Sequence, residues 1–140
     1  MLKLKILSIG KTKEEWLESA LNEYMKRLKP ILSIEFLLAR SDEELLSLAE
    51  KEPLLVCLDP KGKKMDSAAF ANYIQNKFVE GGSKLAIAIG GAEGLPEKLK
   101  SHKNLISFSD LTMTHQIVRL VLIEQIYRAF EIMKGSKYHK

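Results

Sequence analysis

Two runs of five consecutive apolar residues, Leu54–Leu58 and Leu85–Ile89, limit the folds open to this chain. Each run is too short to cross a bilayer, which takes about 20 apolar residues as a helix. Continuous apolar strands of this length are typical of parallel sheets that helices cover on both faces. The two runs therefore predict buried strands in a sheet of this kind.

Segments of alternating or helical apolar spacing lie between and around these runs. Alternation predicts further strands over residues 2–9, 33–38 and 105–108. Helical spacing, capping residues and breakers predict helices from Thr12 to Pro30, from Ser41 to about Lys51, from 66 to 79, a short one at Pro96, and from His115 to about Met133. Strands that alternate with helices indicate the α/β class with a parallel sheet.

Two local details of this prediction follow from sequence signals alone. Thr12 is expected to cap the first long helix, because Glu15 follows three residues later. Asp59–Lys63 is expected to be a loop, because it contains Pro60 and Gly62.

Length and composition favour one soluble domain. The chain has 140 residues, of which 46% are hydrophobic and 29% charged, and no Pro- or Gly-rich linker divides it. The first eleven residues lack the continuous apolar core of a signal peptide. The only cysteine, Cys57, lies in an apolar run, so we expect a buried thiol and no internal disulfide. These features predict a cytoplasmic protein that does not enter a membrane.

The net charge of +4 is unevenly distributed along the chain. Residues 31–59 are acidic, whereas the segments before and after them are basic. A basic face is therefore possible, which leaves nucleic acid open as a class of partner.

Three loops follow predicted buried strands: 58–63, 90–94 and 107–114. The first is basic, the second contains three glycines in five residues, and the third is rich in hydroxyl groups. They are either three tight turns or the walls of one ligand pocket, because the carboxyl ends of parallel strands meet at one edge of a sheet.

Several common sites have no signature here. The chain has no Walker motif and no G-x-G-x-x-G, and Gly10-Lys11-Thr12-Lys13 lacks the upstream glycine of a phosphate loop. The histidines have no metal-ligand spacing with the cysteine or with each other, so no metal is expected. No G-x-S-x-G elbow is present either.

The last predicted helix is apolar on almost every side. Because the sheet covers only one side of such a helix, we expect a second copy of the chain to cover another, which makes a homodimer. Two polar stripes interrupt the apolar surface. One carries His115 and Arg119, and the other carries Glu124, Arg128 and Glu131, with Glu124 and Arg128 in the favourable order for an ion pair.

The C-terminal residues Tyr138-His139-Lys140 follow this helix closely. They form either a frayed end or a contact with nucleic acid, since they offer a ring to stack, a proton carrier and a positive charge.

Three segments together resemble the signatures of a known family. The first pairs Leu58-Asp59 with Gly62-Lys63, and the second is Ile89–Leu95. The third runs from Ser107 to His115 and continues with Val118-Arg119, residues 124–129 and Tyr138-His139. Over essentially its whole length the chain resembles the ribosomal RNA large subunit methyltransferase H family, which are small members of the SPOUT class of knotted methyltransferases.

The resemblance implies a fold and an activity. The implied fold is one SPOUT domain over residues 1–140, a parallel sheet of five to six strands with helices on both faces and a C-terminal trefoil knot. The implied activity is methylation of N3 of pseudouridine 1915 in 23S rRNA by a homodimer. S-adenosylmethionine is the cofactor, and the assembled ribosome is the substrate.

The resemblance also implies the site residues. Cofactor contacts fall on Leu58, Gly91, Ser109, Asp110, Leu111, Thr112, Met113 and Thr114. N3 of pseudouridine must lose a proton before it attacks, so a general base or a donor to the resulting anion is needed. His115, His139 and Glu93 are the candidate bases. Arg119 and Arg128 are candidates to stabilise the anion or bind phosphate, and Tyr138 to stack on the target base.

The chain departs from the family pattern in a few places. Ala92, Thr114 and Lys137 stand where prolines are common, and the connection at 39–41 is short and lacks a basic segment. This short connection affects the expected ribosome contact surface and not the pocket. Two other functions stay open: a SPOUT methyltransferase that acts on tRNA, and a ribosome-binding module without catalytic activity.

Overall fold

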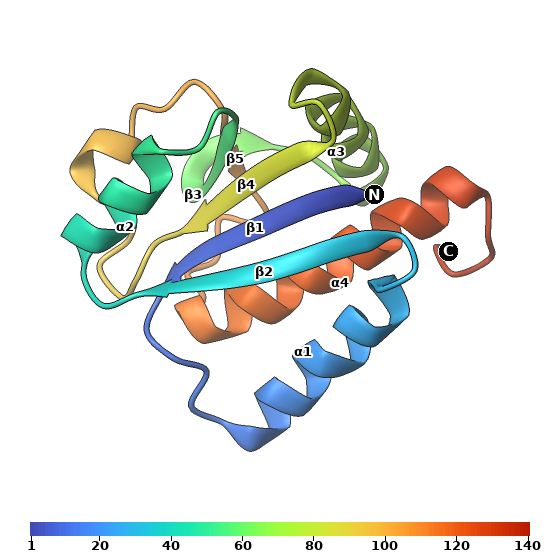
Figure 1. Cartoon of the computed structure of the whole chain (residues 1–140), viewed down its shortest axis with the longest axis horizontal. Helices are drawn as coiled ribbons and strands as arrows, with labels where there is room; N and C mark the ends of the chain where they lie inside the picture. Colours follow the sequence, from blue (N-terminus) through green and yellow to red (C-terminus); the bar gives the residue numbers. More distant parts are fainter.

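The two apolar runs form the middle of a five-stranded parallel sheet in the computed structural model, which describes residues 1–140 (Figure 1). The strand order is β2-β1-β4-β3-β5. The strands are β1 (Leu2–Ile9), β2 (Leu32–Ala39), β3 (Leu55–Lys64), β4 (Lys84–Ile89) and β5 (Leu105–Ser107). The helices are α1 (Glu15–Leu28), α2 (Asp42–Glu50), α3 (Ser67–Glu80) and α4 (His115–Lys134), with a short 3-10 helix η1 (Glu97–Leu99). The predicted parallel α/β sheet is confirmed.

Helices cover both faces of the sheet, and each face has its own core. The helices α1, α3 and α4 pack on one face around a cluster of 21 buried residues, and α2 packs with Leu95 and Leu99 on the other around ten. The central strand β4 supplies large residues to the first core (Leu85, Ile87 and Ile89) and alanines to the second. Because alternate residues of a strand point to opposite faces, the sequence LAIAI places bulk where three helices pack and small residues where α2 approaches.

Most helix ends lie where the sequence predicts them. The hydroxyl of Ser41 accepts from the backbone N–H of Glu44, and the carboxylate of Asp66 accepts from that of Ala69. The predicted cap at Thr12 is wrong. Helix α1 begins at Glu15, and its N-cap Glu14 makes no side-chain cap. The hydroxyl of Thr12 instead accepts from Arg119, so a distant partner takes the group that the local pattern assigned to the cap.

The predicted loop at Asp59–Lys63 is also wrong, because β3 continues through it to Lys64. Ile106 of β5 pairs with Leu58 and again with Lys63, so the residues between them bulge out of the ladder and the chain then returns to β5. Asp59 supports this bulge by accepting from the backbone N–H of Lys61 at 2.8 Å. Gly62 permits the return, because a Cβ there would lie 2.5 to 2.7 Å from backbone atoms of Ile106.

None of the helices combines the length and the apolar character that crossing a membrane requires.

Replacing Gly62 with alanine tests this close approach. The added methyl group must push β5 away, so we expect G62A to lose about 1–3 kcal/mol of unfolding free energy. Denaturant unfolding measures the loss, and K61A is the matched control because Lys61 is an exposed neighbour in the same bulge. Equal unfolding midpoints for the two variants would contradict the pairing of Lys63 with Ile106.

Candidate functional site

A pocket of about 140 Å³ lies at the carboxyl edge of the sheet, where the three predicted loops meet. The first of these segments is the bulge within β3, and the other two follow β4 and β5. The three strands are neighbours in the sheet. The lining consists of Leu58, Asp59, Pro60, Ile89, Gly90, Gly91, Ala92, Gly94, Leu95, Ser107, Phe108, Ser109, Leu111, Thr112, Met113, His115 and Val118. The sequence left open whether these segments are three separate tight turns or the walls of one ligand pocket, and the structure favours one pocket.

The loop after β4 is closed on itself. Gly91 and Gly94 form an isolated bridge, and Gly94 has a φ of +88°, which non-glycine residues rarely adopt. A Cβ on Gly90 would lie 2.2 Å from the backbone carbon of Gly94. The glycines therefore form a wall of the pocket from backbone atoms, because they have no side chains that would fill the space.

The loop after β5 is shaped by its own hydroxyl groups. Ser107 is buried, and its hydroxyl donates to the carbonyl of Ser109 at 3.0 Å and accepts from the N–H of Ser109 at 3.2 Å. The hydroxyl of Ser109 in turn accepts from the N–H of Leu111 at 2.9 Å. These bonds leave the side chain of Leu111 74% exposed beside the pocket. The hydroxyls thus position apolar groups at the pocket.

The lining contains no lysine and no arginine. Asp59 is its only carboxylate, and His115 its only other ionisable side chain. A phosphate group needs a cradle of N–H groups or positive charges, and no basic side chain here supplies one. The pocket instead suits a ligand with a flat apolar part and no phosphate.

Most of the expected cofactor contacts reach this pocket. Leu58, Gly91, Ser109, Leu111, Thr112 and Met113 line it. Asp110 and Thr114 do not: the carboxylate of Asp110 pairs with Lys64, and the hydroxyl of Thr114 caps α4 by accepting from the N–H of Ile117. Glu93 is exposed and lies outside the lining, between lining residues of the glycine loop.

His115 is the first residue of α4 and lines the pocket. Its Nε2 lies 3.3 Å from the amide nitrogen of Gln116, which also donates to the carbonyl of Lys11. Burial lowers the pKa of His115 below its usual value, and the positive charges of Arg119 and Lys13 lower it further. The imidazole is therefore neutral at pH 7.

Arg119 is fully buried and does not line the pocket. Its five N–H groups all bond to protein oxygens, none of which is charged. Nε donates to the hydroxyl of Ser8 at 2.9 Å, and Nη2 donates to the carbonyls of Ile9 and Gly10 at 2.6 and 2.5 Å. Nη1 donates to Thr12 at 3.1 Å and to Gln116 at 3.4 Å. Burial lowers the pKa of this guanidinium.

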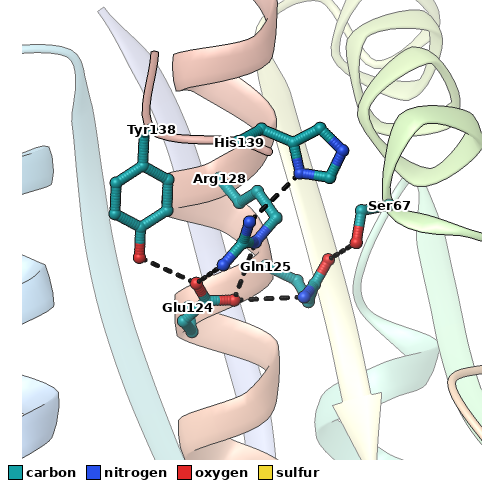
Figure 2. Close-up of polar contacts among 6 residues, drawn as sticks. All are labelled: Ser67, Glu124, Gln125, Arg128, Tyr138 and His139. Carbon is teal, nitrogen blue, oxygen red and sulfur yellow. Dashed lines mark hydrogen bonds and ion pairs between the residues drawn. The ribbon is translucent and has the colours of Figure 1, made fainter. Parts of the chain in front are cut away.

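The remaining candidates gather at the other end of α4 in a tail cluster, defined by Glu124, Arg128, Tyr138 and His139 (Figure 2). Glu124 accepts from Arg128 at 2.7 Å and from the Tyr138 hydroxyl at 2.8 Å. Arg128 also lies 3.1 Å from Nδ1 of His139. Burial raises the pKa of Tyr138, as do hydrogen bonds with Tyr24 and Glu124, so the phenol stays protonated. The C-terminus is thus bonded to α4 and is not a frayed end.

The pocket and the tail cluster are separate within one chain. His115 and Arg128 are 13 residues apart on α4, which corresponds to about 20 Å along the helix axis. The structure therefore brings His115 to the pocket and Arg128, Tyr138 and His139 to each other, but it does not bring the two groups together.

Sequence reasoning missed part of the pocket lining and all of the groups that surround Arg119. Ile89, Leu95 and Val118 line the pocket, and their position next to the predicted loops is the signal that could have found them. Ser8, Gln116 and the backbone of 9–10 surround Arg119, and no local pattern points to them.

Replacing Arg119 with methionine tests the role of its buried bonds. The variant leaves five oxygens without their donor, so we expect it to lose about 3–5 kcal/mol of unfolding free energy. R27M is the control, since Arg27 is also an arginine on a helix but its side chain is 41% exposed. Denaturant unfolding compares the two. An R119M protein as stable as R27M would show that these bonds do not hold the fold.

Comparison with known proteins supports one assignment. A family model described as predicted SPOUT methyltransferase matches residues 2–139. The chain is 61% identical over 140 residues to a protein of Protochlamydia amoebophila named ribosomal RNA large subunit methyltransferase H, and the match covers all of both chains. A protein of the same name from Halothermothrix orenii is 38% identical, with 99% of this chain and 100% of the relative covered.

Solved structures show a similar fold at low identity. TrmJ from Z. mobilis ZM4 superposes with a TM-score of 0.53 at 6% identity, covering 91% of this chain and 69% of its own. A probable methylase family protein from Haemophilus influenzae Rd KW20 gives a TM-score of 0.52 at 13% identity, covering 96% and 67%.

Proposed function

Because the chain belongs to the SPOUT methyltransferase family, we propose that it methylates N3 of pseudouridine 1915 in 23S rRNA of the assembled ribosome. S-adenosylmethionine is the proposed methyl donor, and residues 1–140 are the proposed catalytic domain. The rRNA substrate rests on the name shared by the relatives, and a cytoplasmic location is part of the same proposal. Family membership also implies the C-terminal trefoil knot.

The observation that carries this proposal is the chemistry of the pocket. Its backbone-walled glycine loop and apolar side chains suit an adenine ring, and the lack of basic residues suits a donor without phosphate. Asp59 is the one carboxylate that can face a positively charged ligand. S-adenosylmethionine, when bound, supplies a methyl group on a sulfonium that leaves as a neutral thioether.

The chain's own residues then have two tasks. The lining residues, with His115 neutral beside them, position the donor and exclude water from its apolar part. The tail cluster offers the polar groups that a deprotonated pyrimidine ring needs, since Arg128, Tyr138 and His139 together provide a positive charge, a ring and a hydrogen-bonding imidazole. Arg119 bonds only to protein oxygens, so we assign it to positioning the start of α4 and not to contact with the substrate.

A homodimer is part of this proposal. Helix α4 has a half-buried apolar side with Ile117, Leu120 and Val121, and the exposed Leu111 lies before it. A second copy that packs its own α4 antiparallel on this side would cover these residues. The same arrangement would bring the tail cluster of one copy toward the pocket of the other, which removes the separation within one chain.

Methyl transfer to ribosomes tests the proposed reaction. Ribosomes that lack the modification are incubated with S-adenosylmethionine carrying a labelled methyl group, and the labelled nucleotide is mapped. We expect the label at one pseudouridine of 23S rRNA. Label on tRNA only would identify tRNA as the substrate in place of rRNA. Cofactor binding without any methyl transfer would favour a ribosome-binding module without catalytic activity.

Deletion of Tyr138–Lys140 tests whether cofactor binding and stabilisation of the substrate depend on different residues. The deletion leaves the pocket intact, so we expect cofactor affinity within about twofold of the full chain by calorimetry. Methyl transfer should fall below detection, because the ring and imidazole of the tail cluster are gone.

Deletion of Lys140 alone is the control, since it removes one charge and no member of the tail cluster. Unchanged turnover after the longer deletion would exclude the tail from the reaction.

A further inference from the structure

The contact between Arg128 and His139 determines which nitrogen of the imidazole carries its proton. Nη1 of Arg128 lies 3.1 Å from Nδ1 of His139 (Figure 2). A guanidinium has five donors and no acceptor, so Nδ1 must accept in this bond. The neutral ring then carries its proton on Nε2. An imidazolium has a proton on both nitrogens and cannot keep this bond.

Arg128 cannot readily turn away from His139, because it makes two hydrogen bonds to the carboxylate of Glu124. Nη2 and Nε of Arg128 donate to the two carboxylate oxygens of Glu124 at 2.7 and 3.3 Å. Both side chains are mostly buried, with 25% and 20% of their surface exposed. A two-point bond of this kind fixes the plane of the guanidinium.

Glu124 is itself anchored to two other elements. The Tyr138 hydroxyl donates to it at 2.8 Å, which ties it to the tail. The Gln125 amide donates to it at 3.1 Å and accepts from the Ser67 hydroxyl of α3 at 2.8 Å (Figure 2). The chain Ser67–Gln125–Glu124–Arg128–His139 therefore runs from the start of α3 to the imidazole.

The far side of the imidazole is free. His139 is exposed, and its Nε2 has no hydrogen-bond partner within the chain. A proton on Nε2 therefore points away from Arg128, toward whatever approaches the tail. In this state the ring cannot accept a proton at Nε2, because that nitrogen already carries one.

We propose that His139 acts as a neutral hydrogen-bond donor through Nε2–H to a ring oxygen of the target pyrimidine, and not as the general base. Arg128 and Glu124 are positioning residues that fix this tautomer. The inference rests on the proposed function, which places the tail at the substrate.

The Nε2–H group of His139 would act while the methyl group is transferred. The N3 proton passes to a solvent water, N3 attacks the methyl carbon of S-adenosylmethionine, and the carbon–sulfur bond breaks with its electron pair staying on sulfur. The negative charge left by the N3 proton spreads onto the neighbouring carbonyl oxygens, where the Nε2–H donor stabilises it. His139 gains and loses no proton during this step.

Nuclear magnetic resonance tests the tautomer without any substrate. Long-range proton–nitrogen spectra of the full chain at pH 7.5 distinguish a protonated from an unprotonated ring nitrogen, and H139Q assigns the His139 signals by their loss. We expect a protonated Nε2 and an unprotonated Nδ1. R128M should mix the two tautomers, whereas R27M should leave the wild-type pattern. A proton on Nδ1 in the wild type would overturn the proposal.

Kinetics with ribosomes test the donor role. Glutamine places an amide N–H close to the position of Nε2 but has no basic nitrogen. We expect H139Q to keep turnover within about tenfold of wild type with the same pH profile, and H139A to lose about 10²–10³-fold. A base role predicts that both variants lose turnover equally, which would overturn the proposal.

The spectra and the kinetics distinguish a failure of this inference from a failure of the proposed function. If wild-type protein transfers no methyl group to ribosomes, the proposed function fails. The spectra still show whether Arg128 fixes the tautomer of His139.

Discussion

The guanidinium of Arg119 is the only charged group among the buried residues, and the site depends on how it is bonded. Four of its five partners come from the end of β1 and the residues after it, and the fifth comes from α4. Burying this charge costs free energy, which the lowered pKa reflects, and five oriented oxygens offset that cost. These bonds join the first turn of α4 to the carboxyl edge of the sheet. His115 and Val118 of the pocket wall belong to that turn, so the wall and the buried charge are held together.

The same charge shapes the electrostatics of the site. It helps to keep His115 neutral, and the pocket lining contains no positive side chain of its own. The lysines near the pocket are exposed: Lys11 and Lys13 follow β1, and Lys61 and Lys63 lie in the bulge of β3. This separation suits the proposed reaction, because a cationic donor requires a pocket without positive charge, whereas RNA phosphates meet the protein at its surface.

Local patterns in the sequence predicted most of the fold because local forces decide most of it. Apolar runs, caps such as Ser41 and Asp66, and the glycine loop after β4 need no distant partner to be interpreted. The errors at Thr12 and at the bulge of β3 arise where a distant group decides. Arg119, 107 residues away, takes the Thr12 hydroxyl, and β5 pairs with the end of β3. The spacing of His115 and Arg119 likewise places both on one side of a helix, but only packing decides that one faces the pocket and the other is buried.

The candidate pocket and the tail cluster lie at opposite ends of one helix, which cannot bring them together. Helix α4 packs along its length against the sheet, α1 and α3, and its buried residues extend from Arg119 to Phe130. A helix packed this way does not bend enough to close about 20 Å between its ends. Methyl transfer needs the donor and the groups that stabilise the substrate anion within a few ångströms of the same atom. If both groups act in one reaction, the tail must come from another chain. The apolar side of α4 and the fixed geometry of the tail cluster therefore support the same proposal, a dimer in which each copy completes the site of the other.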